Sequence, residues 1–313
     1  MKIDDRSSSL LSFMDNSIIE KETRITKNDH QIKKYDTNEA FTRIIYTKSG
    51  GRYVYNSTDG KVVEKATKSI IDNQQYQSKL SSLGFYNGPI DGVLTSSVSQ
   101  KAIRNFQRVY GLSQSGVFNS TTENMLNNVY SSYQSVYNSS QLASISSSSN
   151  FGLDSTERAN FARIWAFLRV GMGATATQAA GVMGNIYAES RFSSDNAYNS
   201  YYPGDHNPSY SYNSNDGIAY GIAQWADPTR KAGLQTESNT MSLSVSDINA
   251  QLAFLRNELT GSYSSTWNSI VGYGNVNSVS DAFYYNFEGG SSSSVAIARQ
   301  NFSNTIYNSF YSF

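Results

Sequence analysis

Residues 181–192 read Gly181-Val-Met-Gly-Asn-Ile-Tyr-Ala-Glu-Ser-Arg-Phe192. The apolar residues Val182, Ile186 and Phe192 recur at the spacing of one helix face. The glycines between them leave room for neighbouring elements to approach closely. The stretch therefore predicts a helix that is packed on several sides and lies at the centre of its domain.

This predicted helix carries one carboxylate, Glu189, near its C-terminal end. Burial of an unpaired carboxylate raises its pKa, and a protonated carboxyl is what a general acid needs at neutral pH. The negative end of the helix dipole acts in the same direction. A solvated residue at a helix end is the alternative interpretation of Glu189, and the stretch alone leaves both open.

Composition limits the domain count and the class of partner. A chain of 313 residues can hold two or three domains. Its 25 basic and 25 acidic residues balance, so we expect no nucleic-acid binding. The apolar runs fall short of the ~20 residues of a membrane helix, and the N-terminus lacks the apolar core of a signal peptide. We therefore expect no membrane insertion, and synthesis in the cytoplasm without a secretory signal.

The inventory of reactive side chains narrows the chemistry. The sequence has no cysteine and only two histidines, His30 and His206, which lie far apart. Catalytic zinc usually takes two or three closely spaced histidines. A serine hydrolase would need a G-x-S-x-G turn, which is missing. We expect no metal and no cofactor, and carboxylate chemistry remains.

Residues 74–129 form a partly repeated pattern. The apolar residues Tyr76, Leu80 and Leu83 mark one helix face, and Gly84 ends the helix. The segments 90–95 and 114–119 echo each other, with Thr95 and Asn119 placed to cap the helices that follow. The pattern predicts a small core of three helices.

Three motifs in this region resemble one known family: Leu83-Gly-Phe-Tyr-Asn-Gly-Pro-Ile-Asp-Gly92, Ala102-Ile-Arg-Asn-Phe-Gln107 and Ser115-Gly-Val117. They are similar to the peptidoglycan-binding domain type 1 family. The resemblance implies a non-catalytic module whose partner is bacterial cell-wall peptidoglycan.

The flanking segments are simpler. Phe41–Tyr46 and Arg52–Tyr55 predict two strands joined by a glycine turn, within an N-terminal segment of residues 1–70. That segment has no catalytic motif, and a phage-tail or particle partner could bind it. The Ser-rich composition of residues 131–153 predicts a flexible linker. The predicted domains are therefore residues 1–70, 71–130 and 154–313, with the linker before the last.

The C-terminal region resembles the phage tail lysozyme family over about residues 155–310. The similarity lies in the helix ending at Glu189, followed in order by Tyr220-Gly-Ile-Ala-Gln-Trp225, Arg230, Gln251-Leu-Ala-Phe-Leu255 and Glu258-Leu259. It implies a lysozyme-like α+β domain in which a helix-terminal glutamate faces a small β element across a sugar-binding cleft. By this resemblance Glu189 is the catalytic acid and Gln224 is a cleft residue that binds substrate, and we expect Tyr220 and Trp225 to bind substrate beside it.

The second carboxylate is open. Glycosidases normally use two, ~5–5.5 Å apart in retaining and ~6.5–9.5 Å apart in inverting enzymes. Asp216, eight residues before Gln224, is the preferred candidate. The rivals are Asp195, Asp205 and Asp227, each also a plausible turn residue. We interpret Glu258 and Glu288 as structural partners, and some enzymes of this fold use a single glutamate.

The sequence thus predicts a multi-domain, mainly α-helical protein with a small β-containing N-terminal segment, a three-helix wall-binding domain and a lysozyme-like catalytic domain. The predicted function is a peptidoglycan hydrolase, an endolysin or tail-associated lysin, that cleaves the β-1,4 bond between N-acetylmuramic acid and N-acetylglucosamine. It would act at the cell wall after release by lysis or carriage on a phage or tail-like particle. The alternatives are a lytic transglycosylase and a non-catalytic wall-binding or tail structural protein.

Overall fold

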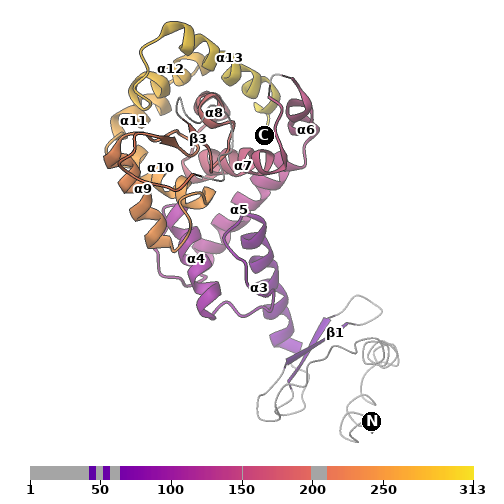
Figure 1. The fold of residues 1–313 in the computed structure, drawn as a ribbon. Coiled ribbons are helices and arrows are strands. Elements are labelled where there is room, and N and C mark those ends of the chain that lie inside the picture. The colour runs from indigo at the N-terminus through magenta and orange to yellow at the C-terminus, as the bar shows by residue number, and fades with distance from the viewer. Residues whose placement is uncertain (1–41, 47–51, 57–63, 150, 199–209) are drawn as a thin grey trace, which may run out of the picture. The chain divides into compact units, whose positions relative to one another are not determined.

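A computed structural model of the chain describes residues 42–46, 52–56, 64–149, 151–198 and 210–313, with side chains from residue 70 onward (Figure 1). Contacts divide the chain into two compact units. One comprises Met1–Gln75 with Ile90–Val93, and the other comprises Tyr76–Pro89 with Leu94–Phe313. Among the helices of the described ranges, none is long and apolar enough to span a bilayer.

The first unit contains an antiparallel strand pair, β1 (Thr42–Tyr46) and β2 (Arg52–Asn56), with Ile44 opposite Val54. The predicted hairpin is confirmed. The predicted partner site on residues 1–70 lies outside the described side chains.

Three helices carry the pattern read in residues 74–129: α3 (Glu64–Ser82), α4 (Ser97–Val109) and α5 (Ser120–Tyr137). Asn119 caps α5 as predicted, by accepting a hydrogen bond from the Thr122 N–H. Ser96, one residue after the predicted Thr95, caps α4. The apolar side chains between these helices are buried, and they include Leu80, Leu83, Ile103, Phe106, Val109 and Leu126.

The Ser-rich stretch predicted as a flexible linker is instead helical and packed. Helix α5 continues to Tyr137, and α6 (Ser140–Ser147) follows after one turn. Val136 and Leu142 are fully buried. The prediction was wrong because a few apolar residues at helical spacing are enough to fix a segment on a neighbouring core, whatever the composition between them.

The remaining elements surround α8 (Ala176–Ser190), which contacts α13 (Ser293–Phe310), α12 (Val276–Asn286) and α7 (Ser155–Ala166) (Figure 1). A π-helical turn, η1 (Phe167–Gly171), joins α7 to α8. The C-terminal region also contains three further helices, α9 (Pro228–Met241), α10 (Ile248–Thr260) and α11 (Ser264–Gly272). It has one small sheet, formed by β3 (Ala197–Tyr198) and β4 (Ala219–Tyr220). The mainly helical fold with a small sheet in this region is the predicted one.

Glycine allows α8 to lie directly against α13. A Cβ added to Gly184 would fall 2.7 Å from the Cα of Ser303, well inside van der Waals contact. Ser303 also donates a hydrogen bond to the carbonyl of Gly181, 3.1 Å away. The backbones of the two helices therefore touch one turn before Glu189.

Gly184→Ala is expected to lower the free energy of unfolding by about 1–3 kcal/mol, because the added methyl group forces α8 and α13 apart. Urea denaturation of wild type and variant measures the loss. The matched control is Gly272→Ala at the end of α11, where an added Cβ meets no atom within 4 Å. That control should change stability by less than about 0.5 kcal/mol. Equal losses in both variants would contradict this account.

Within the second unit, the three-helix segment packs on α9 and α10. Arg108 of α4 forms a bidentate ion pair with Glu237 of α9, whose side chain is 6 % exposed. Asn257 donates to the same carboxylate at 2.9 Å. Asn105 donates to the Met241 carbonyl at 3.0 Å, and Asn249 donates to the Leu83 carbonyl at 3.2 Å. The buried polar groups of this interface find their hydrogen-bond partners across it, and they hold the three-helix segment on α9 and α10.

Candidate active site

Glu189 is the next-to-last residue of α8, where the chain turns sharply. The helix starts at a capping box of Thr175 and Gln178. After Glu189 and Ser190, both Arg191 and Phe192 take left-handed backbone conformations, with φ of 54° and 69°. Phe192 turns into the core and is fully buried. This turn leaves the Glu189 side chain at the rim of the core, with one fifth of it exposed.

The partner of Glu189 is Arg299 of α13, whose Nη2 donates to Oε1 of the glutamate. The environment of Glu189 therefore differs from both sequence interpretations, since the carboxyl is neither isolated in an apolar setting nor freely solvated. The Arg299 guanidinium lies 4.8 Å from the ring centre of Tyr284 on α12. Its Nη1 donates to the Asn185 carbonyl at 3.3 Å. Three helices thus fix this arginine.

A second carboxyl, Glu288, lies against the same guanidinium. It follows α12, its side chain is 5 % exposed, and its Oε2 is 3.3 Å from Nη1 of Arg299. Among the described residues, no well-aligned N–H or O–H donor reaches either oxygen of Glu288. Burial and the nearby negative charge of Glu189 raise the pKa of Glu288 well above its usual range, against the opposing charge of Arg299. Two carboxyls therefore share one arginine at the end of α8.

The turn after β4 is held against the same end of α8. The hydroxyl of Ser190, next to Glu189, donates to the Ile222 carbonyl at 3.0 Å. Gln251 of α10 accepts from the Ile222 N–H at 2.9 Å. Gln224 adopts a left-handed conformation, φ 46°, and donates to the carbonyls of Gly221 and Asn196. The small β element thus adjoins the glutamate-bearing helix end.

Two residues predicted to contact substrate, Tyr220 and Trp225, are buried beside the β4 turn. Trp225 is 1 % exposed and donates from Nε1 to Glu258 at 2.8 Å. Tyr220 is 5 % exposed and lies against the rings of Tyr210 and Tyr212. Both rings help to anchor the turn on the core, and substrate binding by Tyr220 and Trp225 stays a prediction. Substrate binding by Gln224 stays a prediction.

Asp216 is the counter-ion of a buried lysine. Its Oδ1 lies 2.6 Å from Nζ of Lys231, a side chain with no exposed surface, and Tyr210 donates to its Oδ2 at 3.0 Å. Burial raises the pKa of Asp216, but hydrogen bonds from Lys231 and the Ile218 N–H outweigh this and hold the pKa below its usual range. The carboxyl found beside Glu189 is Glu288, which the sequence interpretation treated as structural.

The rival aspartates have local roles. Asp227 caps α9 by accepting from the N–H groups of Thr229 and Arg230. Asp195 accepts from the Ser193 hydroxyl at 2.7 Å. Asp205 lies outside the described residues. Glu258 has the structural role expected of it, since Arg230 binds it through Nε at 2.7 Å and Nη2 at 3.0 Å.

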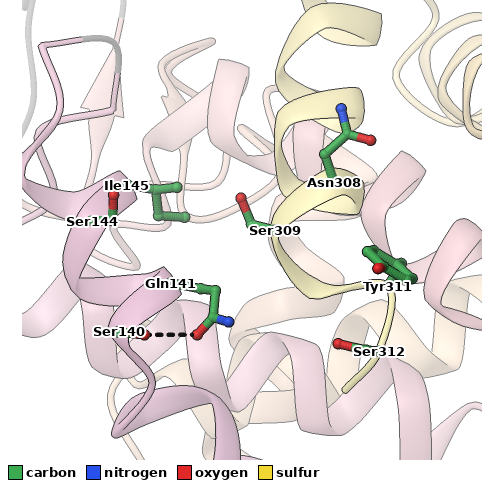
Figure 2. Close-up of a pocket in the computed structure, with 8 residues that line it drawn as sticks. All are labelled: Ser140, Gln141, Ser144, Ile145, Asn308, Ser309, Tyr311 and Ser312. Atoms are coloured by element: carbon green, nitrogen blue, oxygen red, sulfur yellow. Dashed lines mark hydrogen bonds between the residues drawn. The ribbon is translucent and has the colours of Figure 1, made fainter.

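A cavity of about 600 Å³ lies away from these residues, between α6 and the C-terminal end of α13 (Figure 2). Its lining is uncharged and polar apart from one isoleucine: Ser140, Gln141, Ser144, Ile145, Asn308, Ser309, Tyr311 and Ser312. None of the carboxyls described above belongs to it. In the described ranges, no group of three His, Cys, Asp or Glu side chains is arranged to hold a metal ion.

Comparison with known families confirms both resemblances predicted from the sequence. Residues 159–310 match the family described as phage tail lysozyme, and residues 72–126 match the family described as putative peptidoglycan binding domain. Searches of curated proteins and of solved structures found no match. The two matched regions support a cell-wall lytic enzyme with a lysozyme-like glycosidase domain.

Proposed function

Because residues 159–310 match the phage tail lysozyme family, we propose that this chain cleaves the glycan strands of bacterial peptidoglycan while residues 72–126 hold it on the wall. The bond cleaved is the β-1,4 bond between N-acetylmuramic acid and N-acetylglucosamine. In keeping with that family's description, the protein reaches the wall on a phage tail or tail-like particle, or after lysis.

One observation carries the catalytic part of this proposal. Glu189 is a partly exposed carboxyl at the end of a buried helix, next to the β4 turn and beside a second carboxyl. In its protonated form, Glu189 donates its proton to the leaving glycosidic oxygen while the bond from that oxygen to the sugar C1 breaks. The positive charge that develops on the sugar ring is then quenched by attack at C1.

Attack by water makes the protein a muramidase. The water oxygen bonds to C1, and its proton goes to the carboxylate that Glu189 has become. The products are a free reducing end on N-acetylmuramic acid and a free 4-hydroxyl on N-acetylglucosamine, so one water is consumed for each bond cleaved.

A lytic transglycosylase is the second candidate. Asp216 is paired with Lys231, so the aspartate preferred from the sequence is already engaged as a counter-ion. Attack by the C6 hydroxyl of the same sugar needs no further carboxylate to orient a water. It gives an anhydro end and consumes no water.

Product analysis tests the function. Purified peptidoglycan is incubated with the full-length chain, reduced with borohydride, and its muropeptides are identified by mass spectrometry. New reduced N-acetylmuramic acid ends are the expected result. Anhydro ends, lighter by one water before reduction, would replace the muramidase with the transglycosylase. The absence of any new end, with the protein still bound to the wall, would overturn the catalytic proposal and leave a wall-binding protein.

A further inference from the structure

The cluster of Glu189, Glu288 and Arg299 supports an inference that rests on the proposed function and deepens it. We propose that Glu288 is a positioning residue that shares one proton with Glu189 and returns it to the catalytic acid after each transfer. Glu288 is the buried member of the pair and Glu189 the one that solvent reaches, with side chains 5 % and 20 % exposed.

The count of charges is the first reason. Two ionised carboxylates beside one guanidinium would leave a net negative charge in a largely buried site, which is costly. One proton on the pair makes the cluster neutral. Glu288 is the more buried carboxyl, and no described N–H or O–H donor is aligned on its oxygens, so we assign the resting proton to it. The Arg299 guanidinium meanwhile donates to the Glu189 carboxyl.

Two arginines near Glu288 stabilise its ionised form. Arg230 of α9 and Arg299 of α13 both favour the ionised form of Glu288. Arg230 is itself neutralised by Glu258 of α10. From α12 the Tyr284 ring lies against the Arg299 guanidinium, and from α8 the Glu189 carboxyl faces Glu288. Glu288 can therefore become an anion when its proton moves to Glu189.

The proton balance closes without another reactant. The shared proton moves from Glu288 to Glu189, and Glu288 becomes the partner anion of Arg299. Glu189 gives that proton to the leaving oxygen as the C1–O bond breaks. The attacking hydroxyl, from water or from the sugar, bonds to C1 and releases its proton to the carboxylate pair. The pair again holds one proton.

Glu288→Gln separates proton sharing from packing. Glutamine keeps the shape of the protonated carboxyl, but it cannot pass a proton to Glu189 or take one back. We expect kcat to fall on the order of tenfold or more, with KM little changed. We also expect the alkaline limb of the pH profile of kcat/KM to move to lower pH, since Glu189 would then face Arg299 without a competing carboxyl.

The matched control is Asp281→Asn. Asp281 lies on α12, seven residues before Glu288, and joins α12 to α13 by accepting from the Gln300 side chain at 2.7 Å. That variant should keep the wild-type pH profile. A uniform loss of rate in Glu288→Gln, with both limbs of the profile in place, would mean that Glu288 only supports the fold and would overturn the inference.

Two further measurements keep the test valid if Glu288→Gln folds poorly or the wall is not cleaved. Between the ordinary glutamate pKa of ~4.3 and the raised pKa of Glu288, the folded state holds a proton that the unfolded state releases. Wild-type stability should therefore fall as pH rises through that window, and Glu288→Gln should lose this dependence. Carbon-13 NMR of the wild-type carboxyls should show two coupled titration steps, one of them well above the glutamate range. Independent ionisation of both near pH 4–5 would overturn the inference even if the protein cleaves glycan.

Discussion

Glu189→Gln is expected to lower kcat on purified peptidoglycan by about 10²–10⁴-fold, the usual contribution of a general acid. The amide has nearly the same shape and still offers an oxygen to Arg299, but it has no acidic proton for the leaving oxygen. Release of new sugar ends measures the loss. The midpoint of denaturation should change little, because the side chain lies at the rim of the core with one fifth of its surface exposed.

Two aspartate variants complete this experiment. Asp227→Asn keeps the cap of α9, because asparagine caps helices as well as aspartate, and should retain wild-type activity. Asp216→Asn removes the counter-ion of Lys231 and should lower stability more than kcat. A loss of kcat in Asp216→Asn as large as in Glu189→Gln, in a folded protein, would restore Asp216 as the second catalytic carboxylate. More than a tenth of wild-type activity in Glu189→Gln would remove Glu189 as the acid.

Glu258→Ala is expected to lower the free energy of unfolding by about 3–5 kcal/mol, the typical cost of removing one partner of a buried ion pair. The variant leaves Arg230 unpaired between the rings of Tyr263 and Phe287, 4.8 and 4.5 Å from its guanidinium. It also removes the acceptor of the Trp225 indole N–H. Denaturant titration at neutral pH measures the loss.

The double variant Arg230→Leu with Glu258→Leu is the control for this pair. It removes both charges and should lose less stability than Glu258→Ala, because no uncompensated charge stays behind. Arg230 also donates to the carbonyl of Phe287, the residue before Glu288, at 3.1 Å. Glu258→Ala should therefore reduce glycan cleavage as well. A stability loss below about 1 kcal/mol would show that this ion pair contributes no more than a surface pair.

Local patterns in the sequence predict much of the fold. The apolar spacing around Val182 and Ile186 predicted α8, and the terminal position of Glu189 singled it out. Asn119 capped α5 as its side chain suggested. These predictions succeed because helix periodicity and capping depend on residues within one or two turns of each other.

The partners of Glu189 depend on contacts that no local pattern records. Arg299 lies on the last helix and Glu288 follows α12, so only the packing of α12 and α13 on α8 brings them together. The sequence did contain one signal. Glu288 directly follows Phe287, which is buried, so burial of the Glu288 carboxyl could have been expected as it was for Glu189. The burial of Trp225 was equally hidden from the sequence, because an indole ring suits a sugar platform and a core equally well until its N–H partner is known.

The ion pair between Arg108 and Glu237 has a consequence for how this protein would work on a wall. Because α4 is fixed on α9 and α10, the α4 helix and the lysozyme-like region keep one mutual orientation. Under the proposed function, a glycan strand bound by residues 72–126 would reach Glu189 at one angle, and the entropy of aligning the two regions would be lost during folding rather than at each encounter. A protein built in this way would have to release the wall before it could reach the next bond.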